Sequence, residues 1–189
     1  MRKFILSLML FFFAVSGASA AVKFSVPEWK WGAGRDAIAA QAQGELYLEK
    51  DAWLWYTSYD AYDECILETQ YGFNAKDRLC SAKWHVRPQP DSKVGLAHML
   101  GEYNRLKDVF ISRYGAPYEN VVFVTRGEEK SQTYPKTPPA PTAADIQPDT
   151  QYMFESRWNV DGVSIFMYVS VSKKGNPSID ISFNNAKYE

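Results

Sequence analysis

Asp161-Gly162 lies between two stretches in which apolar and polar residues alternate, and this feature constrains the fold most. Such a dipeptide favours a two-residue β-hairpin turn. When the flanking residues are paired across the turn, they separate into two different faces. The apolar pairs are Trp158–Ile165, Phe154–Val169 and Tyr152–Val171. The pairs on the other face are Arg157–Phe166 and Glu155–Tyr168.

A second hairpin is predicted from residues 65–73 and 80–86, which flank the turn-like sequence NAKDRL. One register gives an apolar face with the pairs Phe73–Cys80, Tyr71–Ala82, Thr69–Trp84 and Leu67–Val86. The same register leaves Glu68–His85 and Gln70–Lys83 on a polar face. It also places Cys65 far along the ladder from Cys80, which disfavours a disulfide. An alternative register would pair these cysteines directly, so a bridge between them stays open.

Helical spacing is clearest in residues 95–114, where apolar side chains recur every three to four positions. Gly115 and Pro117 then favour the end of a helix. A shorter helix is expected between Gly34 and Gly44. Residues 126–151 hold five of the ten prolines and are predicted to form a long exposed loop without regular structure.

The order of these elements predicts an α+β fold with two layers. An antiparallel sheet is covered on one face by two helices, with a possible duplicated helix–three-strand unit. Residues 21–189 are expected to form a single domain, with the proline-rich loop at 126–151 as an excursion from it.

The N-terminus predicts an exported protein. Arg2 and Lys3 precede the apolar run 4–15, and Ala18-Ser19-Ala20 provides the small residues that a signal peptidase requires. Residues 1–20 are therefore interpreted as a signal peptide, and the protein is expected to be periplasmic or secreted. No integral membrane segment is expected after cleavage, because no later stretch is long and apolar enough.

The run Gly32-Ala33-Gly34-Arg35-Asp36-Ala37 matches G-x-G-x-x-A, a variant of a dinucleotide-binding pattern. A dinucleotide site needs a buried strand that leads directly into the glycine turn. Pro27 and the following residues interrupt that connection. The run is therefore interpreted as a helix start with Gly34 at the N-cap, and no cofactor is expected.

Charge and histidine content limit the other functional classes. The chain has 21 basic and 22 acidic residues without a basic run, so nucleic acid is not expected as a partner. His85 and His98 are the two histidines, and no HExxH, CxxC or GxSxG motif occurs. No metal site and no catalytic residues are predicted. Glu68 opposite His85 is the best polar cluster, and an exposed cross-strand pair is the favoured interpretation.

Aromatic residues make up 15% of the chain and are concentrated in residues 53–62. Because this segment is apolar on both faces, one face is expected to be core and the other could be a binding surface. The alternative is that a loop or helix covers it. The candidate binding residues are Trp53, Trp55, Tyr56, Arg157, Phe166, Tyr168, Glu68 and His85.

Several short motifs carry a family resemblance. They are WKWGAGRDAI at the first helix, the spacing from Tyr71 to Leu79, and Tyr103 to Pro117 as Y-x-x-L-x-x-x-F-x-x-x-YG-x-P. With the ending Ile179 to Phe183, they resemble a set of uncharacterised exported bacterial α/β proteins with WG and YGxP motifs. Gly34 replaces the serine of that pattern, which implies a weaker helix cap. The layout is also similar to small envelope-assembly lipoproteins and to β-lactamase-inhibitor-like proteins.

These observations lead to a first hypothesis of an exported, non-catalytic binding module for a protein or envelope component. An alternative is an inhibitor of an extracytoplasmic hydrolase that acts through the proline-rich loop or the open sheet face. An enzyme that uses Glu68 and His85 is the least favoured hypothesis.

Overall fold

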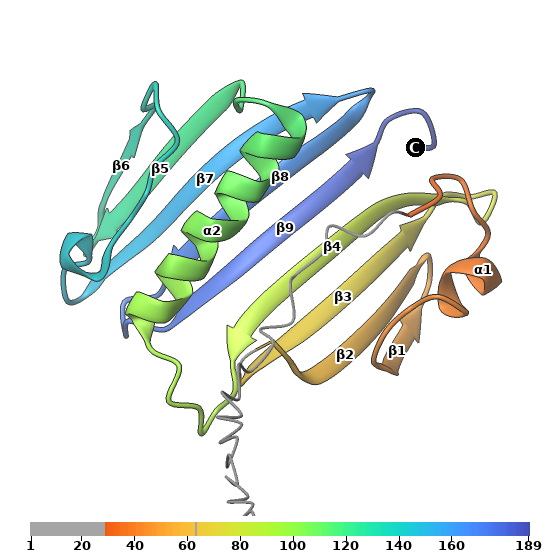
Figure 1. Cartoon of the computed structure of the whole chain (residues 1–189), viewed down its shortest axis with the longest axis horizontal. Coiled ribbons are helices and arrows are strands. Elements are labelled where there is room, and N and C mark those ends of the chain that lie inside the picture. Colours follow the sequence, from red (N-terminus) through yellow and green to blue (C-terminus); the bar gives the residue numbers. More distant parts are fainter. Residues whose placement is uncertain (1–28, 63) are drawn as a thin grey trace, which may run out of the picture.

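A computed structural model describes residues 29–62 and 64–189 (Figure 1). The predicted signal peptide, residues 1–20, lies outside these ranges. The described helices are α1 (Arg35–Ala39), α2 (Leu96–Tyr114) and the 3₁₀ turn η1 (Ala143–Asp145). The described strands are β1 (Glu45–Lys50), β2 (Trp53–Tyr62), β3 (Cys65–Phe73), β4 (Leu79–Pro88), β5 (Glu119–Arg126), β6 (Glu129–Thr133), β7 (Thr150–Val160), β8 (Val163–Val171) and β9 (Pro177–Asn185).

The described strands form one antiparallel sheet with the order β1-β2-β3-β4-β9-β8-β7-β5-β6. The N-terminal strands therefore make one half of the sheet and the C-terminal strands the other. β4 and β9 join the two halves at the centre, with Trp84 opposite Ile181. Figure 1 shows α2 running across β8 and β9 on one face.

Both predicted hairpin registers are present. Across β7 and β8, Trp158 pairs with Ile165 and Arg157 with Phe166 as expected. Across β3 and β4, Glu68 pairs with His85, but an irregularity after Gly72 makes Phe73 pair with Leu79 instead of Cys80. Cys65 and Cys80 are not joined by a disulfide, and Cys65 lies opposite Pro88 at the far end of the hairpin.

The predicted cover of two helices is wrong. α2 has 19 residues and buries an apolar stripe, whereas α1 has only five residues, of which Ile38 alone is buried. Ile38 is the only large apolar side chain between Gly34 and Gly44, so this segment has little to bury against the sheet. The duplicated helix–three-strand unit is also wrong, because the described residues form four strands before α2 and five after it.

Residues 45–62 form two strands that are interrupted after Lys50. β1 and β2 are a hairpin with Asp51-Ala52 between them, and Asp51 adopts a φ of 52° at the turn. The proline-rich stretch 126–151 contains β6 and η1 and is anchored to α2, so it is not without structure. Asn104 donates a hydrogen bond to the carbonyl of Pro141, and Lys107 donates one to the carbonyl of Pro139.

Two apolar clusters fill the helix-covered face. The larger one lies between α2 and the central strands, and the smaller one lies between α1 and the β2–β4 region. Trp29 packs against both clusters. Its ring centroid lies 5.3 Å from that of Trp84 and 5.1 Å from that of Phe183. The opposite face of the sheet is not covered by any described helix.

Candidate functional site: the open face of the sheet

The face of the sheet opposite α2 carries most of the candidate binding residues, and we call it the open face. Partners across a ladder share a face. The registers that connect the open-face positions are Trp55–Gln70, Glu68–His85, His85–Asp180, Tyr168–Asp180 and Glu155–Tyr168. The candidate residues placed on this face are Trp53, Trp55, Glu68, His85, Arg157, Phe166 and Tyr168.

Tyr56 is the candidate residue that lies on the other face. Its side chain is buried in the smaller core cluster, and its ring centroid lies 5.9 Å from that of Tyr71. Because residues 53–56 are apolar at every position, alternation alone does not show which of them face the core. The ladder to β3 places Trp55, and not Tyr56, on the open face.

Asp180 is the centre of the polar part of the open face. Oδ1 of Asp180 lies 3.0 Å from Nδ1 of His85 and 3.2 Å from Nζ of Lys83. Its side chain is only 5% exposed. Burial raises the pKa of Asp180, but the hydrogen bonds and positive charges of His85 and Lys83 outweigh burial, so the pKa is lowered. The carboxylate is thus held ionised between its neighbours.

Tyr168 extends this cluster toward β7. Burial, together with the nearby charge of Asp180, raises its pKa to about 12, and Glu155 adds to the effect. The hydroxyl group therefore stays protonated at neutral pH and can act as a hydrogen-bond donor.

Arg157 forms the far end of the cluster. It donates hydrogen bonds to Glu155 on its own strand and to Glu119 on β5. Its guanidinium carbon also lies 5.7 Å from the ring centroid of Phe166. An arginine that is held by two carboxylates and rests on an aromatic ring is restricted in orientation.

Glu68 and His85 face each other across the ladder, but their side chains have different partners. Glu68 accepts a hydrogen bond of 3.1 Å from Arg87, whereas His85 contacts Asp180. Toward the β1 end, Trp53 and Trp55 have ring centroids 6.0 Å apart. The open face therefore combines two aromatic regions with a row of paired charges between them.

The polar cluster also borders a hollow at one end of the sheet. The β4–β9 ladder ends at Val86 and Ile179, and beyond it lie the connection from β4 to α2 and the turn between β8 and β9. The cavity between these chain segments measures about 600 Å³, with His85 and Arg87 on one wall. Pockets that bind small molecules commonly measure about 300–1,000 Å³, so this hollow has the size that a small ligand requires.

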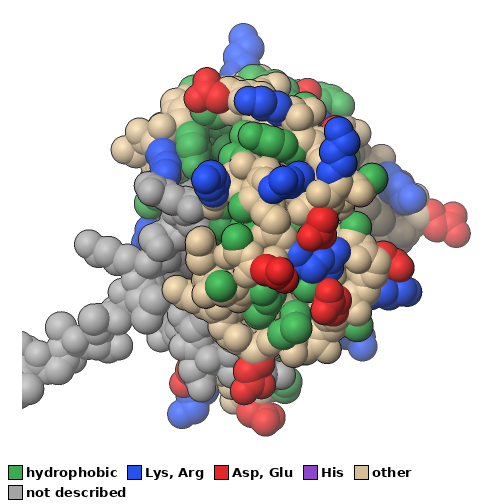
Figure 2. Space-filling model, turned by 90° about the vertical axis from the view of Figure 1, so that its right-hand side faces the viewer, with side chains coloured by type: hydrophobic (Ala, Val, Ile, Leu, Met, Phe, Trp, Pro, Cys, Tyr) green, Lys and Arg blue, Asp and Glu red, His purple; other side chains and the backbone are tan. Residues whose placement is uncertain are grey.

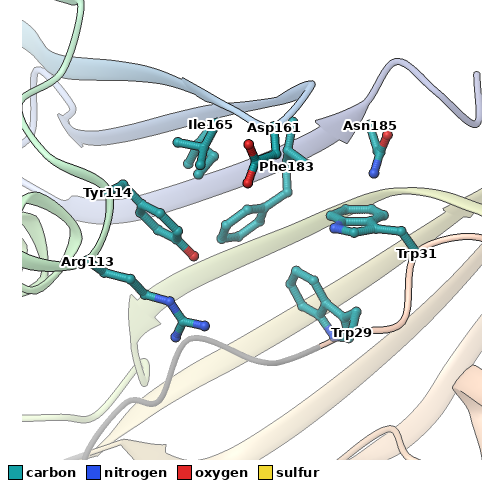
Figure 3. A pocket seen from close by; sticks show the side chains of 10 residues that line it. Trp29, Trp31, Arg113, Tyr114, Asp161, Ile165, Phe183 and Asn185 are labelled. Carbon is teal, nitrogen blue, oxygen red and sulfur yellow. The ribbon is translucent and has the colours of Figure 1, made fainter.

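A separate pocket lies on the helix-covered face (Figure 3). It measures about 360 Å³ and is surrounded by α2, the β7–β8 hairpin, β9 and the segment before α1. Trp29, Trp31 and Tyr114 contribute aromatic surface, and Arg113 and Asp161 contribute charge. The sequence does not reveal this pocket, because its walls come from segments that are far apart in the chain.

Asp180 is also a residue that the sequence does not single out. It lies 95 positions after His85, and their contact depends on the pairing of β4 with β9. The only local signal is an acidic residue between Ile179 and Ile181 in an otherwise uncharged strand. Such a signal does not identify a partner.

Two further properties of the described residues are relevant to the type of site. Within residues 29–62 and 64–189, no group of three or more His, Cys, Asp or Glu side chains is arranged to hold a metal ion. None of the helices in these ranges combines the length and the apolar character that crossing a membrane requires.

Comparison with protein-family models gave no match for this chain. Comparisons with curated proteins and with solved structures also gave no match, so the geometry of the open face carries the functional argument.

Proposed function

We propose that this chain is an exported, non-catalytic binding protein whose open face contacts a partner protein or another component of the cell envelope. One observation carries the proposal. Aromatic side chains and a row of charged side chains share a sheet face on which no described helix packs. Tryptophan, tyrosine and arginine are the residues that most often dominate the binding energy of protein interfaces.

The charge pattern supports a partner with mixed polar and apolar surface. Asp180, Glu68 and Arg157 each have an oppositely charged neighbour on the open face itself. These groups are therefore held in fixed positions. They can select a partner by the arrangement of its charges, and the partner does not need a net charge of one sign. The aromatic regions at either end of the row supply the apolar contact area.

Site-specific photocrosslinking in the native envelope tests the proposal. A photoreactive phenylalanine analogue at Phe166 should capture a discrete partner. The matched control is the same analogue at Tyr118, which is 65% exposed and lies before β5, beside Tyr114 and Trp158 on the helix-covered side. Capture of the same products from both positions, or of none from Phe166, would contradict the proposal.

The hydrolase-inhibitor alternative has less support from the geometry. The segment 126–151 would have to present itself to an enzyme, but its Pro139 and Pro141 carbonyls are occupied by Lys107 and Asn104 of α2. An inhibitor that uses the open face instead would be a special case of the proposal above.

The enzyme alternative needs Glu68 and His85 to act together. Their side chains contact Arg87 and Asp180, respectively, which are the partners expected of structural ion pairs. Replacing both residues by alanine should leave any activity of the purified protein unchanged. Loss of a measured activity in that variant, with folding preserved, would favour the enzyme alternative.

A further inference from the structure

β1 is an edge strand whose exposed side chains differ from those of the opposite edge. The strand order places β1 and β6 at the two ends of the sheet. β6 has the sequence EKSQT, which is polar throughout. In β1, by contrast, Leu46, Tyr47 and Leu48 are 50%, 51% and 42% exposed. An edge with unpaired backbone groups and apolar side chains favours the addition of another strand.

We propose that β1 pairs antiparallel with β1 of a second copy of this chain, around a two-fold axis that places Glu45 opposite Lys50 of the other copy. The contact extends the sheet from one copy into the next. The contact is made by the edge strand β1 and not by the candidate binding residues, so it does not depend on the function proposed above.

The backbone geometry of β1 selects this register. In such a dimer, residues that face each other must lie on the same face of the sheet. Glu45 pairs with Thr57 and Lys50 pairs with Trp53 on β2, and these two β2 positions share a face. In a regular strand, residues five positions apart would lie on opposite faces. The irregularity between Leu46 and Leu48 removes this mismatch.

The remaining pairs of the register also match. Leu46 and Glu49 pair with Tyr56 and Leu54 of β2, so both lie on the helix-covered face and can oppose each other. Leu48 pairs with Trp55 and lies on the open face.

Tyr47 lies near the open face as well. Burial raises the pKa of Tyr47, and the charge of the open-face residue Glu68 adds to that effect. Tyr47 and Leu48 can therefore form apolar cross-strand pairs at the dimer axis. Shifting the register by one residue in either direction would oppose residues from different faces.

Charge complementarity supports the same arrangement. Among the described residues, neither Glu45 nor Lys50 forms an ion pair, whereas Glu49 is bound to Arg35 at 3.1 Å. The proposed register gives each copy a Glu45 and a Lys50 that meet their opposites, so two ion pairs form. Figure 2 shows the side of the molecule that carries α1, where acidic and basic side chains lie next to one another between hydrophobic ones.

Sedimentation equilibrium of the purified exported protein tests this proposal. Glu45 and Lys50 lie at opposite ends of β1 and cannot contact each other within one copy, so reversing their charges changes only the contact between copies. The wild type should dimerise reversibly. Glu45→Lys or Lys50→Glu alone should raise the dimer dissociation constant by about tenfold or more, because two attractive pairs become repulsive. The double variant Glu45→Lys/Lys50→Glu should restore dimerisation to within about threefold of wild type, because the pairs are exchanged.

Glu129→Lys, on the exposed edge strand β6, is the matched control and should leave the dimer unchanged. Circular dichroism of each variant checks that the fold is retained. A wild type that stays monomeric at high protein concentration would overturn the proposal and leave a strand of another protein as the occupant of this edge. Failure of the double variant to recover would overturn the proposed register and the proposal with it.

Discussion

Nδ1 of His85 lies 3.0 Å from Oδ1 of Asp180, and the two residues are also backbone partners across β4 and β9. This contact is at the junction of the two halves of the sheet. It links a buried carboxylate to side chains from the preceding half, so it affects both stability and the shape of the open face.

Asp180→Asn should reduce stability at neutral pH and make stability less dependent on acid. The pKa of Asp180 is lowered in the folded state. Its contribution is therefore present above the unfolded pKa of about 3.9 and is lost as the pH falls through the lower folded value. Removing the charge should cost about 1–3 kcal/mol at pH 7. Urea unfolding at pH 7 and pH 2 measures both effects. If the free energy of unfolding fell by the same amount between pH 7 and pH 2 in the wild type and in the variant, the prediction would be contradicted.

Tyr168→Phe should reduce the loss of stability at alkaline pH. The folded pKa of Tyr168 is about 12, whereas an unfolded tyrosine ionises near pH 10. The folded state thus favours the neutral phenol, and this contribution is complete below about pH 10 and is lost as the pH rises toward the folded value. Urea midpoints at pH 8 and pH 11 provide the measurement. Tyr118→Phe, at an exposed position, serves as the control and should behave like the wild type.

Gly72→Ala should destabilise the open face near Trp53. A Cβ at Gly72 would lie 2.8 Å from the Trp53 ring, so the indole would have to move. We expect a loss of about 1–3 kcal/mol in the free energy of unfolding. Gly101→Ala is the matched control, because a Cβ there meets no atom within 4 Å and the position is inside α2. That change should stabilise by about 1 kcal/mol.

A double-mutant cycle identifies the cause of the Gly72 effect. In a Trp53→Leu background, Gly72→Ala should cost less than in the wild type, because the ring that it displaces is absent. An unchanged cost would show that the backbone, and not the indole, resists the added methyl group.

Deleting residues 128–148 should destabilise the protein. If this segment were a loop without regular structure, its deletion would leave the stability of the fold unchanged. Lys107 is 3% exposed and donates to the carbonyl of Pro139, which the deletion removes. Burial lowers the pKa of Lys107, so an ammonium group without that acceptor is costly. We expect the free energy of unfolding, measured in urea, to fall by about 1–3 kcal/mol. Lys107→Met in the shortened protein should recover part of it, and no recovery would contradict this explanation.

The sequence is sufficient to predict which residues share a face in the two main hairpins. Side chains alternate between the faces of a strand, so a register shifted by one residue would mix apolar and polar residues. Together with the Asp161-Gly162 turn, this alternation predicts the pairing of Trp158 with Ile165. The pairing of Glu68 with His85 is one of two registers that satisfy the alternation, and the structure selects it. The helix at 96–114 is predictable for a similar reason, because its apolar spacing and Gly115 are local signals.

Local sequence patterns do not predict the structure where two possible arrangements fit the pattern equally well. The stretch around Trp55 and Tyr56 is apolar at every position, so only the ladder to β3 shows which side chain is buried. The strand β6 has no apolar alternation because it lies at an edge, and its sequence therefore resembles that of a loop. The glycines around α1 predict a covering helix, although Ile38 is the one buried residue of that helix.

The sequence by itself determined which residues share a face within each hairpin, because that depends on the alternation of side chains along a strand. Only the tertiary structure decided that β4 lies beside β9, and therefore that Asp180 contacts His85 and Lys83. The physical reason is that this pairing joins residues far apart in the chain. It is selected by burial of the whole core between the sheet and α2, and no local pattern encodes that burial.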